Sequence, residues 1–219
     1  RNNTAALARP VSTNGWFTFS GQQRLESAAP LKLKGRSFSG GAWLRLGQTG
    51  RSGTVLDTRG RPTGGFVLGI HAATTGQLSA PFSFAPYAYL GVHAAKGNST
   101  NVELPPTSRL GQFCTQAIRT GRDLYAGYSI DGDGGRACFF CAAGGAIEEE
   151  SVVFNALPDS WPLSAAESNV TAGFKNLPSQ QHSRLTGLIG ELGGLAVVDS
   201  KVLTTREHAA LANALGDGL

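Results

Sequence analysis

Apolar and polar residues alternate over short runs through the first two thirds of the 219-residue chain. Residues 38–46 show the pattern most clearly, with two faces that carry Phe38, Ala42, Leu44 and Leu46 on one side and Ser39, Trp43 and Arg45 on the other. A period of two with one apolar face predicts a half-buried β-strand. Further strands are predicted at residues 16–19, 54–58, 66–71, 87–93, 123–130, 136–142 and 152–154.

The turn at residues 131–135 reads Asp-Gly-Asp-Gly-Gly and separates two of the predicted strands. Asp and Gly tolerate positive φ, so this sequence favours a β-hairpin. Residues 188–198 then predict one long apolar strand that contains several glycines.

The last part of the chain predicts a short helix. Thr204 and Glu207 have the spacing of a capping box, in which each side chain binds an unpaired amide of the first turn. Alanines and leucine follow at residues 209–214, and Gly216 occupies the expected position of a C-terminal cap. Since neither a linker nor an internal repeat interrupts the chain, we expect one domain.

Three stretches carry a resemblance to a known superfamily. The first is Phe19-Ser20-Gly21 together with residues 38–44, and the second is residues 113–132, which end in Leu-Tyr-Ala-Gly-Tyr-Ser-Ile-Asp-Gly. The third is residues 187–192 together with Leu-Thr-Thr-Arg-Glu at 203–207. In order and spacing they resemble strands of the laminin-G-like, concanavalin A-like jelly-roll superfamily, residues 113–132 resembling one of its hairpins. The resemblance implies an all-β, two-sheet antiparallel jelly-roll sandwich with one short C-terminal helix over residues 1–219.

Three positions depart from the superfamily pattern. Ser20 and Gly190 stand where the family has aspartates, and Phe113 stands where it has a tryptophan. These changes keep the apolar pattern, so the fold expectation is unaffected. They remove carboxylates, which are the hard oxygen ligands of calcium, and so weaken the transfer of a metal site from the family.

Composition narrows the functional classes. The net charge is +4, and no segment has the density of Lys and Arg typical of nucleic-acid binding. No run of about 20 apolar residues predicts membrane insertion. Arg51, Arg59 and Arg61 are close in sequence but separated by glycines and a proline, which fits a surface loop or a patch for anionic sugars or an acidic partner.

Several features point to the secretory pathway. N-x-S/T acceptor sites occur at Asn2, Asn98 and Asn169, each in a polar stretch that favours a surface loop. The chain starts at Arg1 and contains no Met, so we expect a piece of a longer secreted or cell-surface protein.

Three cysteines, Cys114, Cys138 and Cys141, allow one internal disulfide and leave one thiol over. Three pairings are open. The Cys-x-x-Cys spacing at 138–141 lacks the helix and βαβ unit of a redox site, and scattered histidines provide no fourth zinc ligand. We interpret the cysteines as structural.

Acidic residues are candidate catalysts and metal ligands. A glycoside hydrolase on this fold needs acids at alternating positions of a strand, whereas residues 148–150 are three contiguous glutamates and Glu191 stands alone among glycines. Asp131 and Asp133 resemble the start of a calcium loop, although a hairpin turn explains them better. No cofactor is expected, with calcium as the possible exception.

The remaining candidates are ligand-binding aromatics and arginines. Trp43, Tyr87 and Tyr89 fall opposite the more aliphatic strand faces, where aromatic rings stack on sugars or anchor protein partners. With Arg59 and Arg61 they form the predicted binding set. We hypothesise a non-catalytic extracellular recognition or adhesion module for a glycan or protein. The alternatives are an assembly domain of a cell-surface or filament glycoprotein, packed on copies or neighbouring domains, and a glycoside hydrolase.

Overall fold

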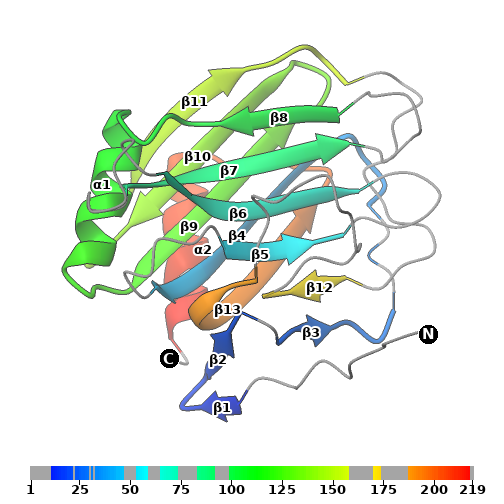
Figure 1. The fold of residues 1–219 in the computed structure, drawn as a ribbon. Helices are drawn as coiled ribbons and strands as arrows, with labels where there is room; N and C mark the ends of the chain where they lie inside the picture. The colour runs from blue at the N-terminus through cyan, green and yellow to red at the C-terminus, as the bar shows by residue number, and fades with distance from the viewer. Residues whose placement is uncertain are drawn as a thin grey trace, which may run out of the picture.

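The computed structural model describes residues 11–21, 23–29, 31, 33–46, 53–58, 65–73, 83–91, 99–157, 170–173 and 187–217. Two antiparallel sheets lie face to face (Figure 1). One sheet has the order β1 (Val11–Thr13), β2 (Trp16–Ser20), β13 (Ile189–Asp199), β4 (Ser37–Leu46), β9 (Leu124–Asp131), β10 (Arg136–Ala142) and β11 (Glu148–Val153). The other has the order β3 (Leu25–Glu26), β12 (Thr171–Ala172), β5 (Gly53–Asp57), β6 (Phe66–Ala73), β7 (Ser83–Gly91) and β8 (Ser99–Glu103).

The alternation along the strands puts one apolar face of each sheet between the layers. Phe38 of β4 and Phe66 of β6 stack across the sandwich with ring centroids 4.1 Å apart. Tyr128 of β9 meets Phe139 of β10 edge to face at 5.9 Å. Burial of such rings is the main stabilising contribution to the fold. The predicted jelly-roll sandwich is therefore confirmed.

Most strand predictions match the structure within a few residues. Residues 38–46 form β4, residues 136–142 form β10, and residues 188–198 form most of β13. The predicted hairpin between β9 and β10 is also present, because Asp131 pairs with Arg136 across its turn. The strand predicted at 152–154 begins earlier, at Glu148, as the edge strand β11.

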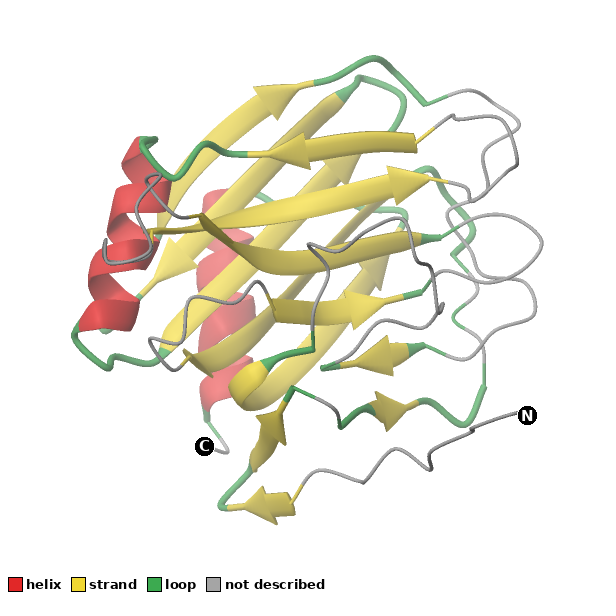
Figure 2. Ribbon diagram, in the orientation of Figure 1, coloured by secondary structure: helices red, strands yellow, loops and turns green. Residues whose placement is uncertain are grey.

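One part of the predicted hairpin at residues 113–132 is wrong. Its first half lies in the helix α1 (Arg109–Arg119), which Figure 2 shows at one end of the sandwich. The side chain of Ser108 accepts a hydrogen bond from the amide of Gly111 and so begins the helix. The apolar residues buried by α1 are Leu110, Cys114, Ala117 and Ile118, and their spacing of three and four is that of a helix rather than a strand.

The predicted C-terminal helix is α2 (Thr205–Gly216), which covers the outer face of the seven-stranded sheet (Figure 1). Its capping box is complete, since Thr204 and Glu207 each bind the backbone of the other residue. The predicted cap at Gly216 is one residue early, because the helix includes Gly216 and Asp217 is the C-cap. A side chain at Gly216 would begin 3.2 Å from Trp43 Nε1, so glycine allows the helix to approach the sheet.

The backbone at Gly190 leaves no room for a side chain. Its φ is 140°, and a Cβ there would lie 2.3 Å from the carbonyl oxygen of Arg45 on β4. Any side chain would have to displace the neighbouring strand.

We expect Gly190→Ala to lower the free energy of unfolding by about 2 kcal/mol, the cost of a side chain in a strained backbone position. Gly145→Ala is the matched control, because nothing lies within 4 Å of its Cβ position. That variant should remain within about 0.5 kcal/mol of the parent in urea unfolding. Equal stability of the two variants would contradict the close approach at Gly190.

No helix in the described residues is long and apolar enough to cross a membrane.

Candidate functional site

A surface hollow of about 620 Å³ lies where the outer face of the seven-stranded sheet meets the end of α2. Its lining residues come from separate segments of the chain and are Trp16, Trp43, Gly121, Arg122, Asp123, Ala143, Gly144 and Gly216. A hollow of this size holds a small ligand such as one or two sugar rings. We call it the Trp43 hollow.

Trp43 is held in one orientation by contacts on two sides. Its indole Nε1 donates a hydrogen bond of 2.8 Å to the carbonyl oxygen of Ala212 on α2. Its ring packs against Tyr125 of β9, with ring centroids 5.7 Å apart. Because the indole N–H is used internally, the part of the ring that lines the hollow offers an apolar surface.

Arg45 organises the wall beside Trp43. Its Nε and Nη2 donate to both carboxylate oxygens of Asp123 at 2.6 and 2.9 Å, and its Nη1 donates to Glu191 at 2.8 Å. These two acids raise the pKa of the Arg45 guanidinium further above its ordinary value. The bidentate pair fixes the Asp123 carboxylate at the hollow, where its remaining lone pairs can accept hydrogen bonds.

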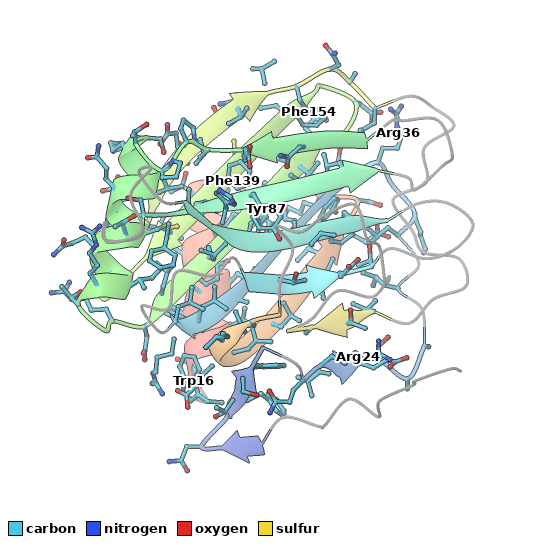
Figure 3. The ribbon with its side chains drawn as sticks, in the orientation of Figure 1. Trp16, Arg24, Arg36, Tyr87, Phe139 and Phe154 are labelled. Carbon is cyan, nitrogen blue, oxygen red and sulfur yellow. The ribbon has the colours of Figure 1, made fainter. Side chains whose placement is uncertain are left out.

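Trp16 contributes to the same wall in a different way. It is only 4% exposed, and the Arg45 guanidinium carbon lies 4.0 Å from its ring centroid. Figure 3 shows Trp16 at the start of β2. Since Arg45 covers its face, Trp16 supports the hollow and leaves Trp43 as the ring available to a ligand.

Arg122 supplies a guanidinium whose hydrogen-bond donors are not used by other described side chains. Its side chain is exposed and makes no hydrogen bond or ion pair with another described residue. Gly121 and Gly144, with φ of 67° and 74°, have nothing within 4 Å of their Cβ positions. The rim therefore consists of a free guanidinium, a fixed carboxylate and uncovered backbone.

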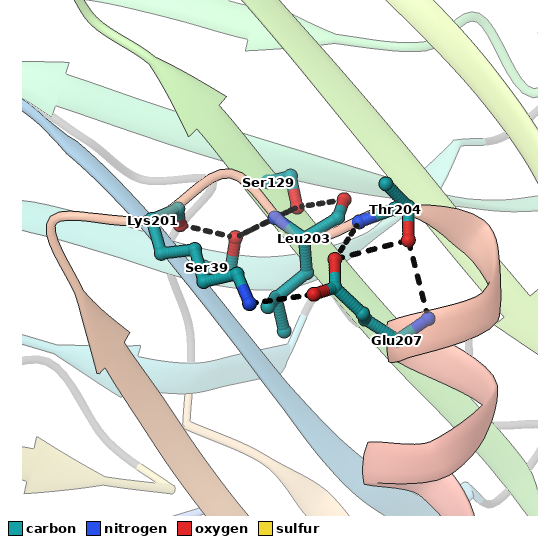
Figure 4. A network of polar contacts seen from close by, with 6 residues as sticks. All are labelled: Ser39, Ser129, Lys201, Leu203, Thr204 and Glu207. Carbon is teal, nitrogen blue, oxygen red and sulfur yellow. Dashed lines mark hydrogen bonds and ion pairs between the residues drawn. The ribbon is translucent and has the colours of Figure 1, made fainter.

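A polar network lies under α2, next to a second hollow of about 350 Å³. Figure 4 shows Ser39 and Ser129 binding the segment that leads into the helix. The Ser129 hydroxyl contacts Ser39 Oγ at 2.8 Å, donates to the Leu203 carbonyl at 3.0 Å and accepts from the Leu203 amide at 3.1 Å. The network joins the sheet to the start of the helix.

His208 extends this network into the sheet. Its Nε2 lies 2.9 Å from Ser129 Oγ, its Nδ1 lies 2.9 Å from the Tyr125 hydroxyl, and its ring stacks on Phe140 at 3.9 Å. A serine beside a histidine has the geometry of a nucleophile and its base. Here both residues are buried, and burial lowers the pKa of His208 to about 4. A base this weak, bound to a serine already saturated by Leu203, fits a structural anchor.

The predicted binding residues divide into three groups. Trp43 lines the hollow, and its role in ligand binding stays a prediction. Tyr87 is only 4% exposed, so the prediction of an exposed aromatic there is wrong (Figure 3). Its ring packs over Gly69, where a Cβ would lie only 2.5 Å from the ring, so the space depends on glycine. The remaining predicted positions lie outside the described residues, namely the side chain of Tyr89, Arg59, Arg61 and the acceptor sites Asn2, Asn98 and Asn169.

Asp131 and Asp133 are occupied by protein contacts. Asp131 Oδ1 accepts from the amides of Asp133 and Gly134 at 3.2 and 2.9 Å, which stabilises the hairpin turn. Asp133 pairs with Arg36 at 2.9 Å. Among the described residues, no group of three His, Cys, Asp or Glu is placed to hold a metal ion. Calcium binding at Asp131 and Asp133 stays a prediction.

All three cysteines are free thiols in the structure. Cys114 of α1 and Cys141 of β10 are fully buried and within hydrogen-bonding reach, and burial raises the pKa of Cys141 well above its ordinary value. Cys138 lies on the opposite face of β10 and lines the second hollow. The Cys-x-x-Cys residues therefore do not face each other, which agrees with a structural rather than a redox role.

The contiguous glutamates of β11 anchor the two helices. Glu148 pairs with Arg109 at 2.7 Å, and Glu150 accepts from the amide of Leu110 at 2.9 Å at the start of α1. Glu149 points to the other face and binds the hydroxyl of Thr205 at the start of α2. Alternating faces were predicted for these residues, and the contacts assign the acids to structural positions.

Most of the hollow was missed in the sequence, including Trp16, Gly121, Arg122, Asp123 and Gly144. The only local signal is the glycine and charge pattern between α1 and β9. The residues meet because β2, β4 and β9 lie in one sheet although they are far apart in sequence.

Comparisons with known proteins agree with the architecture. No family model and no curated protein matches the chain. A heptameric SAP-like pentraxin from Limulus polyphemus is similar, with a TM-score of 0.57 and 14% identity over 92% of this chain and 84% of that chain. The enzymatically active domain of tailspike protein 2 from bacteriophage CBA120 has a TM-score of 0.53 and 11% identity over 95% and 28%.

An arabinofuranosidase solved with arabinofuranosyl-α-1,2-xylobiose has a TM-score of 0.51 and 11% identity over 97% of this chain and 43% of that chain. The chain thus spans most of the pentraxin but less than half of either other protein. At such identities the likeness shows the fold, a concanavalin A-like jelly roll, and leaves function to the site itself.

Proposed function

We propose that this domain is a non-catalytic recognition module that binds an oligosaccharide in the Trp43 hollow. The observation that carries the proposal is the combination of an oriented tryptophan with Asp123 and Arg122 around one hollow of about 620 Å³. The apolar face of a sugar ring packs on an aromatic ring, while its hydroxyls need hydrogen-bond partners at the edge. Trp43 supplies the ring surface, Asp123 an acceptor and Arg122 a donor.

Charge favours an uncharged sugar. Arg45 is shared by Asp123 and Glu191, and the free Arg122 offsets the remaining negative charge. The charges around the hollow therefore sum to zero, so neither a strongly acidic nor a basic ligand gains net attraction.

A hydrolase on the same scaffold would need two carboxylates free to act as acid and as base or nucleophile. The described acids near the hollow, Asp123 and Glu191, both hold Arg45. These contacts support recognition rather than catalysis. Release of reducing sugar from a polysaccharide panel would instead favour the hydrolase.

The setting of the module is also part of the proposal. The three N-glycosylation acceptor sites favour a secreted or cell-surface protein, in which the domain contacts a glycan or a glycosylated partner.

Arg122→Ala is expected to weaken sugar binding about tenfold, since it removes one charge-assisted hydrogen bond and no packing. The test is an array of neutral and uronic-acid oligosaccharides, followed by calorimetry on the spots that bind the parent. Arg206→Ala is the matched control, because Arg206 is exposed on α2 and lies outside both hollows.

The control variant should bind like the parent. A silent array with correctly folded parent protein would remove the basis of the proposal. Preferential binding of uronic-acid spots would contradict the expected neutral ligand.

A further inference from the structure

The C-terminal half of α2 forms one wall of the Trp43 hollow. Gly216 lines the hollow directly, and Ala212 accepts the hydrogen bond that orients Trp43. The site is therefore complete only while α2 is docked on the sheet. Whatever loosens the helix also releases the tryptophan.

One buried residue holds the first turn of that helix against the sheet. His208 is inaccessible to solvent and contacts Tyr125, Ser129 and Phe140, so it joins α2 to both β9 and β10. A Cβ at Gly127 would lie 2.7 Å from His208 Nδ1, which shows how closely the ring fits against the sheet. Neutral imidazole suits this position, since one nitrogen donates and the other accepts.

No carboxylate among the described residues contacts the His208 ring, although the nearby charge of Glu207 favours its protonated form. On the face of the sheet that α2 covers, β9 presents Tyr125 and Asp131, and β10 presents Arg136, Cys138 and Phe140. Asp131 accepts from the amides of Asp133 and Gly134, and Arg136 donates to Ser151. Glu207, the next residue along α2, is held by Lys201 and Thr204, and Glu149 of β11 binds Thr205. The remaining charged groups of the supporting strands are engaged elsewhere, with Arg45 paired to Glu191 and Asp199 bound to the amides of Lys34 and Gly35.

We infer that protonation of His208 undocks α2 and dismantles the Trp43 hollow, so that the domain releases its sugar in acid. The inference rests on the proposed function for its ligand and on the buried contacts for its mechanism. A buried imidazolium that no carboxylate contacts is only partly compensated for its lost hydration, whereas the undocked helix exposes the ring to water.

The pH dependence of undocking follows from the difference in His208 pKa between the docked and the undocked helix. Burial holds the pKa of docked His208 at about 4, against an ordinary value of 6.5 in the undocked helix. Between pH 7.5 and 4.5 the equilibrium constant for undocking should therefore rise by roughly 10- to 100-fold.

Hydrogen exchange of the parent protein tests the mechanism without a ligand. After correction for the intrinsic pH dependence of exchange, protection of α2 amides relative to β10 amides should fall by roughly 10- to 100-fold between pH 7.5 and 4.5. His208→Gln, which keeps a neutral polar side chain, should lose that difference. A further measurement needs only the parent protein and therefore decides the question even if the variant does not fold. If the NMR signal of the His208 ring titrates at the ordinary pKa of 6.5 while the α2 amides stay protected, the inference is wrong.

The oligosaccharide array tests the consequence for binding. Spots loaded with parent protein at pH 7.5 should be emptied by a wash at pH 4.5, and those loaded with His208→Gln should be retained. Spots that never bind at pH 7.5 would refute the proposed function, and the exchange experiment would still decide the docking mechanism. Spots that bind at pH 7.5 and survive the acid wash with the parent protein would refute the acid release alone.

Discussion

Replacing Trp43 by alanine is expected to remove sugar binding and to weaken the docking of α2 at the same time. The substitution deletes the ring that lines the hollow and leaves the Ala212 carbonyl without its indole donor. Loss of a tryptophan at the centre of a binding site commonly costs 2 kcal/mol or more, so affinity should fall by at least about 30-fold. Lost packing against Tyr125 should lower the free energy of unfolding by about 3 kcal/mol.

Trp43→Phe separates the two effects. Phenylalanine keeps an aromatic surface beside the hollow but lacks the N–H that binds Ala212. Calorimetry should therefore find most of the affinity retained, while unfolding in urea should show a loss of about 1 kcal/mol for the missing hydrogen bond. Full affinity in Trp43→Ala would locate the ligand elsewhere on the domain.

The parts of the fold that could be predicted from the sequence are those in which local pattern and tertiary structure agree. Apolar and polar side chains alternate over residues 38–46 because one face of β4 packs in the core, whereas the other face, which carries Trp43, lies on the outer side of the sheet. Thr204 and Glu207 predict the start of α2, because a capping box satisfies its own backbone locally. Such elements depend little on distant residues.

The sequence of helix α1 carries a helical period that differs from the strand implied by the family resemblance. Leu110, Cys114 and Ile118 recur at a spacing of four, which is the helical period. The superfamily pattern instead suggested a strand at the same residues. Local hydrophobic spacing was the better guide here, since α1 closes one end of the sandwich between β7 and β10.

The candidate site could be predicted only in part, for a geometric reason. Trp43 was found because it breaks the aliphatic pattern of its strand. Asp123, Gly144 and Gly216 show no such local signal, and they meet Trp43 only through the sheet order and the docking of α2. Tyr87 has the same strand pattern as Trp43, yet it is buried, so alternation alone does not distinguish an exposed ring from a covered one.

His208 likewise has no local signal in the sequence, although its burial is expected to make stability depend on pH. In its buried position the pKa is about 4, below the ordinary value of 6.5 in the unfolded chain. Below about pH 6.5 the unfolded chain therefore binds a proton that the folded domain does not bind, and stability falls as the pH drops. The fall should total about 3 kcal/mol and end near pH 4, where the folded domain also binds the proton.

Glu207 acts in a different pH window and provides an internal comparison. Lys201 and the backbone of Thr204 lower its pKa to about 2, so the stability it contributes is present above its ordinary value of 4.5 and is lost as the pH falls towards 2. Urea unfolding of the parent at pH values from 7.5 to 2.5 should show both losses.

The two variants should remove these losses separately. His208→Gln should abolish the loss between pH 6.5 and 4, and Glu207→Gln should reduce only the loss below pH 4.5. An unfolding free energy of the parent that stays constant from pH 7 to 4, while Glu207→Gln changes the profile below that range, would mean that the imidazole is not buried as a neutral group. The same result would remove the physical cause of acid release from the Trp43 hollow, because the docking of α2 would then carry no dependence on the charge of His208.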